Sequence, residues 1–417
     1  MQLKKSKDMS ISKLLAVATS SLLAGTAQNV LAVDANNEWQ VDSAVLVYSE
    51  TDRVSVVEPV VSTRKKIGDD EYVKFQIVAD ALTGSSPNGA IKTDSVQTFT
   101  SPSGSGVYTT AAGTTPLDPS FHDTRGAISG EWEKPLNEKL KGIFSANYSQ
   151  EFDYSSLGIG ANLAWDFNQR NTTLTTGISY NLDQVKPVGG MPPGLSAMPT
   201  TTSVSKSKLG DTDDKTIAAL LLGVTQVMGP MHLLQLNYTY SNEDGYLTDP
   251  YKILSVLDNS GALRGTDPYL YEKRPTTRTR HAVYLKDVKQ FGEDVLQFSY
   301  RYAWDDWGIA SHTVDMRYRY ELNGKNYIEP HLRYYLQDKA DFYYYNLVDG
   351  NTPQYASADY RLGDLSTKTI GIKYGHVFAE NNELGIRAEM MQQQAEGDAR
   401  FPDTDAAIIQ LNYSFNF

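Results

Sequence analysis

The C-terminal segment of the chain alternates strictly between apolar and polar residues. In residues 407–417, every second position is aliphatic or aromatic, namely Ile409, Leu411, Tyr413, Phe415 and Phe417. The positions between them are polar, namely Gln410, Asn412, Ser414 and Asn416. Successive side chains of a β-strand point to opposite faces, so this segment predicts a strand with one apolar and one polar face. Large apolar side chains in such a row fit contact with lipid better than the edge of a soluble sandwich.

The same alternation recurs from about residue 40 onward, in segments of roughly ten residues separated by turn-forming residues. Short connections alternate with long polar stretches, which lie at about residues 84–122, 186–213, 241–275 and 338–364. Short periplasmic turns and long extracellular loops are typical of bacterial outer-membrane barrels. Fourteen strands are traced readily, the first at residues 72–83, and residues 44–48 and 54–65 add two more. An even number keeps both chain ends in the periplasm. We therefore predict an all-β transmembrane barrel of about sixteen antiparallel strands, with fourteen as the alternative.

Ionisable residues gather on the face opposite the apolar rows. These residues carry both signs of charge and are Arg301, Arg317, Arg319, Arg333, Arg387, Asp315, Glu321, Glu329 and Glu389. Charged side chains in a membrane barrel are tolerated only toward water, so the pattern predicts that they line a wet lumen. If the lumen is open, the mixed signs predict a pore with little ion selectivity. If the charges pair across a filled lumen, the barrel is closed and acts as a platform.

The N-terminus has the features of a targeting segment. Four lysines, at positions 4, 5, 7 and 13, precede an apolar stretch over residues 14–24, and residues 30–32 read Val-Leu-Ala. This arrangement predicts a secretory signal peptide over residues 1–32, cleaved after Ala32, and a mature barrel over residues 33–417. The alternative is a membrane-anchoring helix, which this stretch is too short to form.

Composition narrows the function further. The chain contains no cysteine, which excludes disulfides, thiolate metal sites and c-type haem attachment. A formal net charge of -12 argues against a nucleic-acid partner, because phosphate binding requires a basic face. The 27 tyrosines are many for this length, and they fit aromatic rings at a lipid and water boundary. Outer-membrane lipid is the partner that such rings and the apolar rows predict. The last strand ends in the aromatic residue Phe417, which resembles the signal by which outer-membrane barrels are recognised, so the barrel assembly machinery is a second expected partner.

Five long blocks carry a resemblance to a known family. They are DALTGSSPNGA at 80–90, LDPSFHDTR at 117–125, DGYLTDPY at 244–251, YRYAWDDWGIASHT at 300–313 and YASADYRLG at 355–363. These blocks resemble those of a bacterial family known as the domain of unknown function number 3570, over essentially the whole mature chain. The resemblance implies an outer-membrane barrel. It also implies an association with flavin transferases and small lipoproteins of extracytosolic redox systems, and hence a periplasmic redox protein or lipoprotein as a further partner.

The first of these blocks contains a candidate cofactor site. Residues 80–86 read Asp-Ala-Leu-Thr-Gly-Ser-Ser, which is similar to the acceptor pattern of proteins that carry FMN through a phosphodiester. On that pattern Ser86 is the attachment oxygen, and Asp80, Thr83 and Gly84 are recognised by the transferase. Ser85 stands where the pattern has Ala. The alternative is an ordinary strand that ends in a Ser-Pro-Asn-Gly turn. The predicted strand order places Ser86 at the extracellular end of its strand, whereas flavin transferases of this kind work in the periplasm. Modification would therefore have to precede insertion of the barrel.

Metal and catalytic signals are weak. Asp305 and Asp306 are adjacent and offer hard oxygen ligands, so they form a candidate cation site, with an aromatic girdle followed by a polar turn as the alternative. The six histidines are scattered and show no HExxH motif. No nucleophile elbow or phosphate loop is present, so we do not expect an enzyme and keep an outer-membrane enzyme as the third alternative. The sequence favours a pore or scaffold in the outer membrane, and next a flavin-bearing or partner-sheathing component of an electron-transfer conduit.

Overall fold

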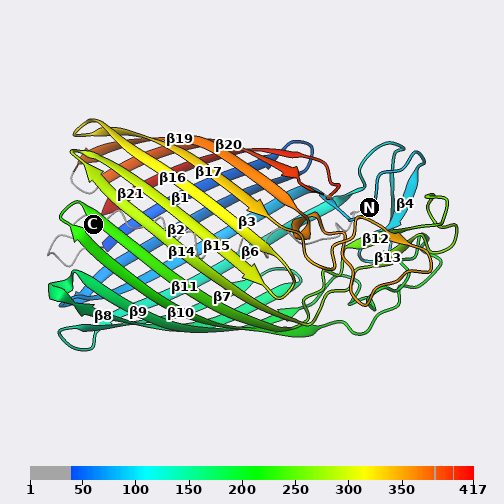
Figure 1. The fold of residues 1–417 in the computed structure, drawn as a ribbon, viewed down its shortest axis with the longest axis horizontal. Coiled ribbons are helices and arrows are strands. Elements are labelled where there is room, and N and C mark those ends of the chain that lie inside the picture. Colours follow the sequence, from blue (N-terminus) through cyan, green and yellow to red (C-terminus); the bar gives the residue numbers. More distant parts are fainter. Residues whose placement is uncertain (1–38, 380–381, 398) are drawn as a thin grey trace, which may run out of the picture.

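The computed structural model describes residues 39–379, 382–397 and 399–417, and in it sixteen antiparallel strands close into a barrel (Figure 1). The predicted signal peptide and its cleavage site after Ala32 lie outside the described residues. In the described part of the chain, no helix is long and apolar enough to cross a membrane.

The barrel strands follow one another around the ring in chain order. They are β1 Trp39–Glu50, β2 Val54–Gly68, β3 Glu71–Pro87, β6 Leu117–Pro135, β7 Leu140–Gln150, β8 Tyr154–Phe167, β9 Thr172–Val185, β10 Asp213–Gly229, β11 His232–Gly245, β14 Thr277–Phe291, β15 Asp294–Asp305, β16 Ala310–Asn323, β17 Asn326–Gln337, β19 Leu365–Ala379, β20 Asn382–Ala395 and β21 Thr404–Asn416. The ring closes where β1 pairs with β21, with Val45 opposite Leu411. The prediction of sixteen strands is confirmed, and the alternative of fourteen is wrong. Both segments added last are strands, because residues 44–48 lie in β1 and residues 54–65 lie in β2.

Each barrel strand exposes its apolar row on the outside of the ring. On β19, the outward residues Ile370 and Ile372 are 62 % and 50 % exposed. Thr369, on the same strand but on its opposite face, is only 8 % exposed. The last strand behaves in the same way, since Ile409, Leu411 and Tyr413 are exposed. A side-chain period of two therefore separates an outer apolar band from an inner polar row, as expected for a wall that meets lipid on one side.

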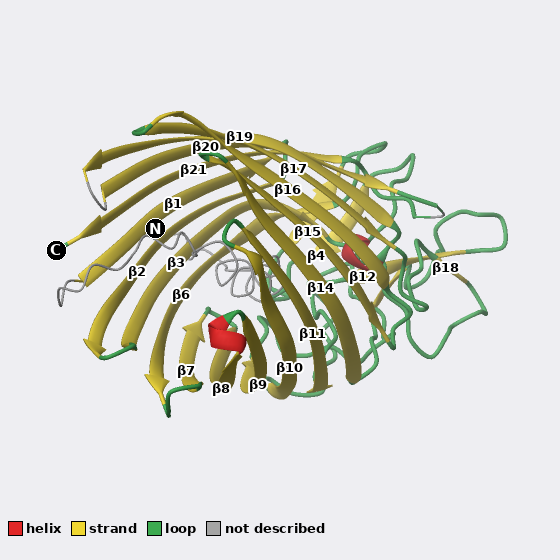
Figure 2. Ribbon diagram, turned by 60° about the vertical axis from the view of Figure 1, so that its left-hand side comes forward, coloured by secondary structure: helices red, strands yellow, loops and turns green. Residues whose placement is uncertain are grey.

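The two ends of the barrel differ (Figure 1). At one end, short turns join consecutive strands, and η1 (Asn168–Arg170) is one of them. At the other end lie four long connections, over residues 88–116, 186–212, 246–276 and 338–364, which we call the cap. Figure 2 shows these loops gathered beyond the strand ends. The cap contains short elements of its own: β4 Gln97–Thr100, β5 Val107–Thr110, β12 Ile253–Leu257, β13 Tyr269–Tyr271, β18 Leu347–Val348 and η2 Tyr360–Leu362.

The cap has hydrophobic cores that join loops distant in sequence. Phe99 of the first connection is fully buried against Met198 of the second and Tyr269 of the third, with the two aromatic ring centroids 4.8 Å apart. In a second core, Leu254 of the third connection packs with Leu347 of the fourth. Burial of one such side chain stabilises by roughly 1.5–3 kcal/mol. The four connections therefore form one packed unit over the barrel mouth.

Candidate functional site

The ionisable side chains of the inner row pair along the barrel wall. His331 on β17 is central, because its Nε2 lies 2.9 Å from Oδ2 of Asp315 on β16 and its Nδ1 lies 2.8 Å from Oε1 of Glu389 on β20. Arg387 reaches Glu329 across the same strands, at 3.5 Å. Every one of these pairs joins strands that are neighbours or next neighbours in the ring.

A glycine makes the reach across β19 possible. His331 and Glu389 are both in register with Gly371, which lies between them. A Cβ atom at Gly371 would lie 2.4 Å from Cγ of Glu389 and 2.9 Å from its Cβ, closer than real contacts. Because glycine has no side chain, His331 and Glu389 can meet over β19.

The predicted lumen residues take part in this arrangement to different degrees. Arg319 pairs with Glu321 at 2.6 Å, and the Asp315 carboxylate lies 3.6 Å from Arg317 and 3.9 Å from Arg333. Arg301 forms no ion pair with a carboxylate among the described residues. The structure thus brings eight of the nine predicted residues into wall pairs, the ninth being Arg301.

A second charged group, which the sequence did not reveal, lies buried in the cap. It contains three carboxylates and three cations from two connections and is made of Asp249, Glu272, Asp359, Lys252, Arg274 and Arg361. Glu272 is 0 % exposed and Asp359 is 1 % exposed. We call this set the cap network. Its equal numbers of opposite charges satisfy the condition under which ions are tolerated away from water.

The contacts of the cap network tie the third and fourth connections together. Asp359 accepts hydrogen bonds from Nη2 of Arg274 at 2.8 Å and from Nη2 of Arg361 at 2.5 Å. Arg361 also contacts Asp249 at 3.0 Å. Glu272 accepts from the backbone N–H of Asp249 at 2.6 Å and from the hydroxyl of Ser357.

Burial and pairing shift the pKa values in the cap network in opposite directions. Burial raises the pKa of Glu272, although Arg274 opposes this effect. For Asp359, burial would also raise the pKa, but Arg361 and Arg274 outweigh it and hold the pKa of this carboxyl well below its usual range. Burial lowers the pKa of Lys252, with nearby carboxylates opposing the change. Asp359 is therefore held in its charged form, in contrast to Glu272.

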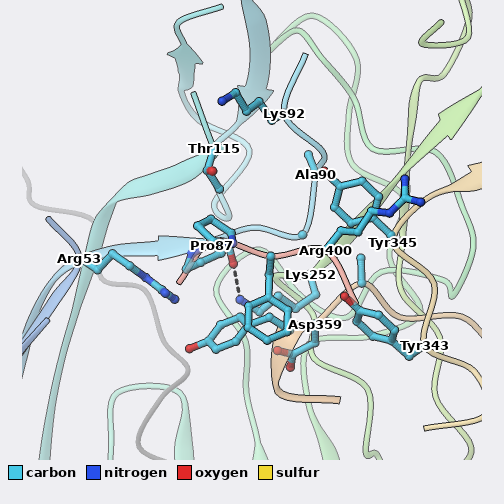
Figure 3. Close-up of a pocket in the computed structure, with 15 residues that line it drawn as sticks. Arg53, Pro87, Ala90, Lys92, Thr115, Lys252, Tyr343, Tyr345, Asp359 and Arg400 are labelled. Carbon is cyan, nitrogen blue, oxygen red and sulfur yellow. Dashed lines mark hydrogen bonds between the residues drawn. The ribbon is translucent and has the colours of Figure 1, made fainter. Parts of the chain in front are cut away.

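A pocket lies where the cap meets the strand ends (Figure 3). Its volume is about 50 Å³, and its walls come from the β1–β2 turn, the first, third and fourth cap connections and the β20–β21 loop. The cationic lining residues are Arg53, Lys92, Lys252 and Arg400. Asp359 is the carboxylate in the lining, and both of its arginine partners already engage it. Tyr343, Tyr345 and Tyr360 supply aromatic walls, and burial raises the pKa of Tyr343 to about 12, which keeps its phenol neutral.

The predicted FMN motif lies at the cap end of β3. Asp80 is buried and forms an ion pair with Arg125 on β6. Thr83 is in register with His122, and Ser86 is 7 % exposed opposite Asp118. The observed strand runs to Pro87, beyond the predicted end at residue 83, so Ser86 belongs to the strand. Covalent attachment at Ser86 stays a prediction.

The predicted cation site is part of the β15–β16 turn. Asp305 pairs with Nη2 of Arg278 at 2.5 Å and accepts the backbone N–H groups of Trp307 and Ile309, both at 3.0 Å. Asp306 accepts from the backbone N–H of Thr279 at 2.9 Å. Among the described residues, no group of three or more His, Asp or Glu side chains is placed to hold a metal ion. The pair stays a candidate site whose oxygens have protein partners.

A closed ring of sixteen antiparallel strands, apolar outside and charged inside, defines a protein with the fold of outer-membrane β-barrels. The chain belongs to the family described as protein of unknown function DUF3570, whose model matches residues 12–415. The resemblance that the five sequence blocks indicated is thereby confirmed.

The chain is similar to several solved structures at low sequence identity. One is a bacterial polysaccharide outer membrane secretin, at 9% identity, a TM-score of 0.44 and coverage of 92% of this chain and 100% of that one. The ferric enterobactin receptor PfeA of Pseudomonas aeruginosa has 9% identity and a TM-score of 0.44, and the match covers 86% of this chain and 54% of the receptor. The CymD monoaromatic hydrocarbon channel has 10% identity and a TM-score of 0.41, with 92% and 89% covered. No curated protein matches the chain.

Proposed function

We propose that the chain forms a pore for small hydrophilic solutes in the bacterial outer membrane, with the cap on the extracellular side narrowing its mouth. The observation that carries this proposal is the closed ring of sixteen strands. Barrels of this size are too wide for their own side chains to fill and leave an aqueous channel. Outer-membrane lipid and the barrel assembly machinery are the partners that such a protein requires.

The direction of the charge pairs supports a pore over a platform. His331, Asp315 and Glu389 pair between strands that are neighbours or next neighbours, so the contacts run along the wall. Pairs that lie along the wall do not need to cross the lumen. The mixed charges then line a path for ions and small polar solutes, with weak selectivity between cations and anions.

Single-channel recording in a planar bilayer tests the proposal. The folded barrel is expected to give discrete conductance steps. Changing Arg317, Arg319 and Arg387 together to Gln should shift the reversal potential toward cation preference, because these arginines would face the permeation path. The matched control is Arg170→Gln, in a turn at the opposite end of the barrel. The Arg170 side chain is 67% exposed, so this substitution should leave the reversal potential unchanged. Absence of conductance steps from folded protein would contradict the pore.

A further inference from the structure

We propose that the pocket between the cap and the strand ends binds a small soluble oxyanion, such as phosphate or a carboxylate. The role of the site in permeation rests on the proposed pore, whereas the binding itself does not. Four cationic side chains line the pocket, and the nearby carboxylates Asp359 and Glu50 are already engaged by arginines. Glu50 offsets Arg53 and the carboxylates of the cap network offset Lys252, so the excess positive charge at the pocket comes from Lys92 and Arg400, and an anion would neutralise it.

Arg53 provides the donor that points to a ligand. Its side chain is only 8% exposed, its Nη1 donates to Thr404, and its Nε lies 3.4 Å from Oε2 of Glu50. Its Nη2 is buried with no hydrogen-bond partner. A buried donor without a partner costs roughly 1–3 kcal/mol, so a ligand oxygen at this position would be favourable. Figure 3 shows the Arg53 side chain extending toward Pro87 at the pocket.

Lys252 approaches the same pocket from the cap. It is 3% exposed, and its ammonium group donates to the backbone carbonyl of Pro87, as the dashed line in Figure 3 shows. An ammonium group has three N–H bonds, so Lys252 keeps donors for a second oxygen. Arg400 and Lys92 are exposed at the rim and would attract an anion from solution.

The dimensions of the pocket limit the ligand. A volume of about 50 Å³ is several times the roughly 10–15 Å³ that a cavity needs to hold one water. This space suits a phosphate ion or a carboxylate group. Charge-assisted hydrogen bonds from arginine and lysine suit such oxygens. At the mouth of a pore, this site would concentrate small anions although the whole chain carries a net charge of -12.

Equilibrium dialysis of the folded barrel, in detergent, against labelled inorganic phosphate and labelled acetate tests the site. Saturable binding of either anion is expected. Arg53→Gln and Arg400→Gln should each weaken it roughly tenfold, as expected for loss of one charge-assisted hydrogen bond. Arg170→Gln, at the opposite end of the barrel, should bind as the unchanged protein does. Arg400 is exposed, so its variant is the decisive one if Arg53→Gln does not fold.

Two results would overturn the proposal. One is absence of saturable binding by the unchanged protein, and the other is unchanged affinity in folded Arg400→Gln and Arg53→Gln. Conductance recorded on the same preparation separates this inference from the pore. Conductance without anion binding overturns the anion site alone, whereas anion binding without conductance leaves the site and contradicts the pore.

Discussion

The cap network predicts that one isosteric substitution will loosen the cap and leave the barrel intact. In Asp359→Asn the side-chain volume is kept, but the negative charge that faces Arg274 and Arg361 is removed. Both arginines lie in the cap, and their remaining partners are Glu272 and Asp249. The substitution therefore leaves an excess of buried positive charge.

The size of the effect follows from burial. Removing one member of a buried ion pair typically costs about 3–5 kcal/mol, because the partner stays buried and uncompensated. Asp359 is 1% exposed, so solvent cannot screen the loss. At about 1.36 kcal/mol per factor of ten, local opening of the cap should become roughly two to four orders of magnitude more frequent.

Hydrogen exchange measured by mass spectrometry on the folded barrel checks this prediction. Peptides from residues 249–275 and 340–363 should lose protection, while peptides from the barrel strands should keep it. The matched control is Asp349→Asn, the same substitution in the same cap. Asp349 pairs with Arg264 at 2.8 Å but is 47% exposed, so its loss should cost at most about 1 kcal/mol.

Equal loss of protection in the two variants would refute the reasoning. It would mean that the hydrophobic cores of the cap, and not the buried charges, hold the connections together. Loss of protection throughout the barrel strands in Asp359→Asn would refute it differently, by showing that the cap and the barrel unfold as one unit.

Three further predictions concern the same structure. Acidification from pH 7 to pH 5 should not lower cap protection, because Asp359 stays charged and the raised pKa of Glu272 does not destabilise the cap as pH falls. The pKa of Asp359 is lowered in the folded protein, so the stabilisation from this carboxylate is present above the unfolded pKa of about 3.9 and is lost only as pH falls through the still lower folded pKa. Hydrogen exchange corrected for intrinsic rates measures the cap protection at each pH. Gly371→Ala should lower the free energy of unfolding in urea by about 1–3 kcal/mol, because the new methyl group meets Glu389, and adding Glu389→Ala should recover part of the loss. Intact mass of the protein from its native membrane should equal the chain from Val33, with an added FMN phosphodiester if Ser86 is modified, and Ser86→Ala should then abolish that increment.

The barrel could be predicted from the sequence because its physical constraints act locally. Alternation such as that of Ile409 and Leu411 with Gln410 reports which face meets lipid, and it needs no knowledge of distant residues. The ends of the strands were predicted less accurately than their existence. Residues 84–87 extend β3 beyond its predicted end, because pairing with β6 continues into a segment whose Gly and Ser residues indicate a turn.

The cap network could not be predicted, since it depends on contacts without a sequence period. Asp249 and Arg361 meet although 112 positions separate them, and neither belongs to an alternating segment. A signal was present, because Asp249 and Asp359 lie within two of the blocks that carry the family resemblance. His331 shows the same limit inside the barrel. Its row was predictable, but its contact with Glu389 depends on the register that places Gly371 between them.

The positions of the two charged groups indicate different roles for them. The pairs around His331 lie on the wall, where each strand is already held by backbone hydrogen bonds to its neighbours, so in the proposed pore their charges would be available to act on permeating solutes. The cap has few such ladders, since its longest strand, β12, has five residues, and it depends on side chains such as Glu272 and Asp359.

The anion pocket adjoins the cap network through Asp359 and Lys252. Occupation of the pocket should therefore favour the closed cap, by linkage between ligand binding and the stability of the state that binds it. Adding phosphate should increase hydrogen-exchange protection in residues 340–363 of the unchanged protein, and Arg400→Gln should need roughly tenfold more phosphate for the same increase.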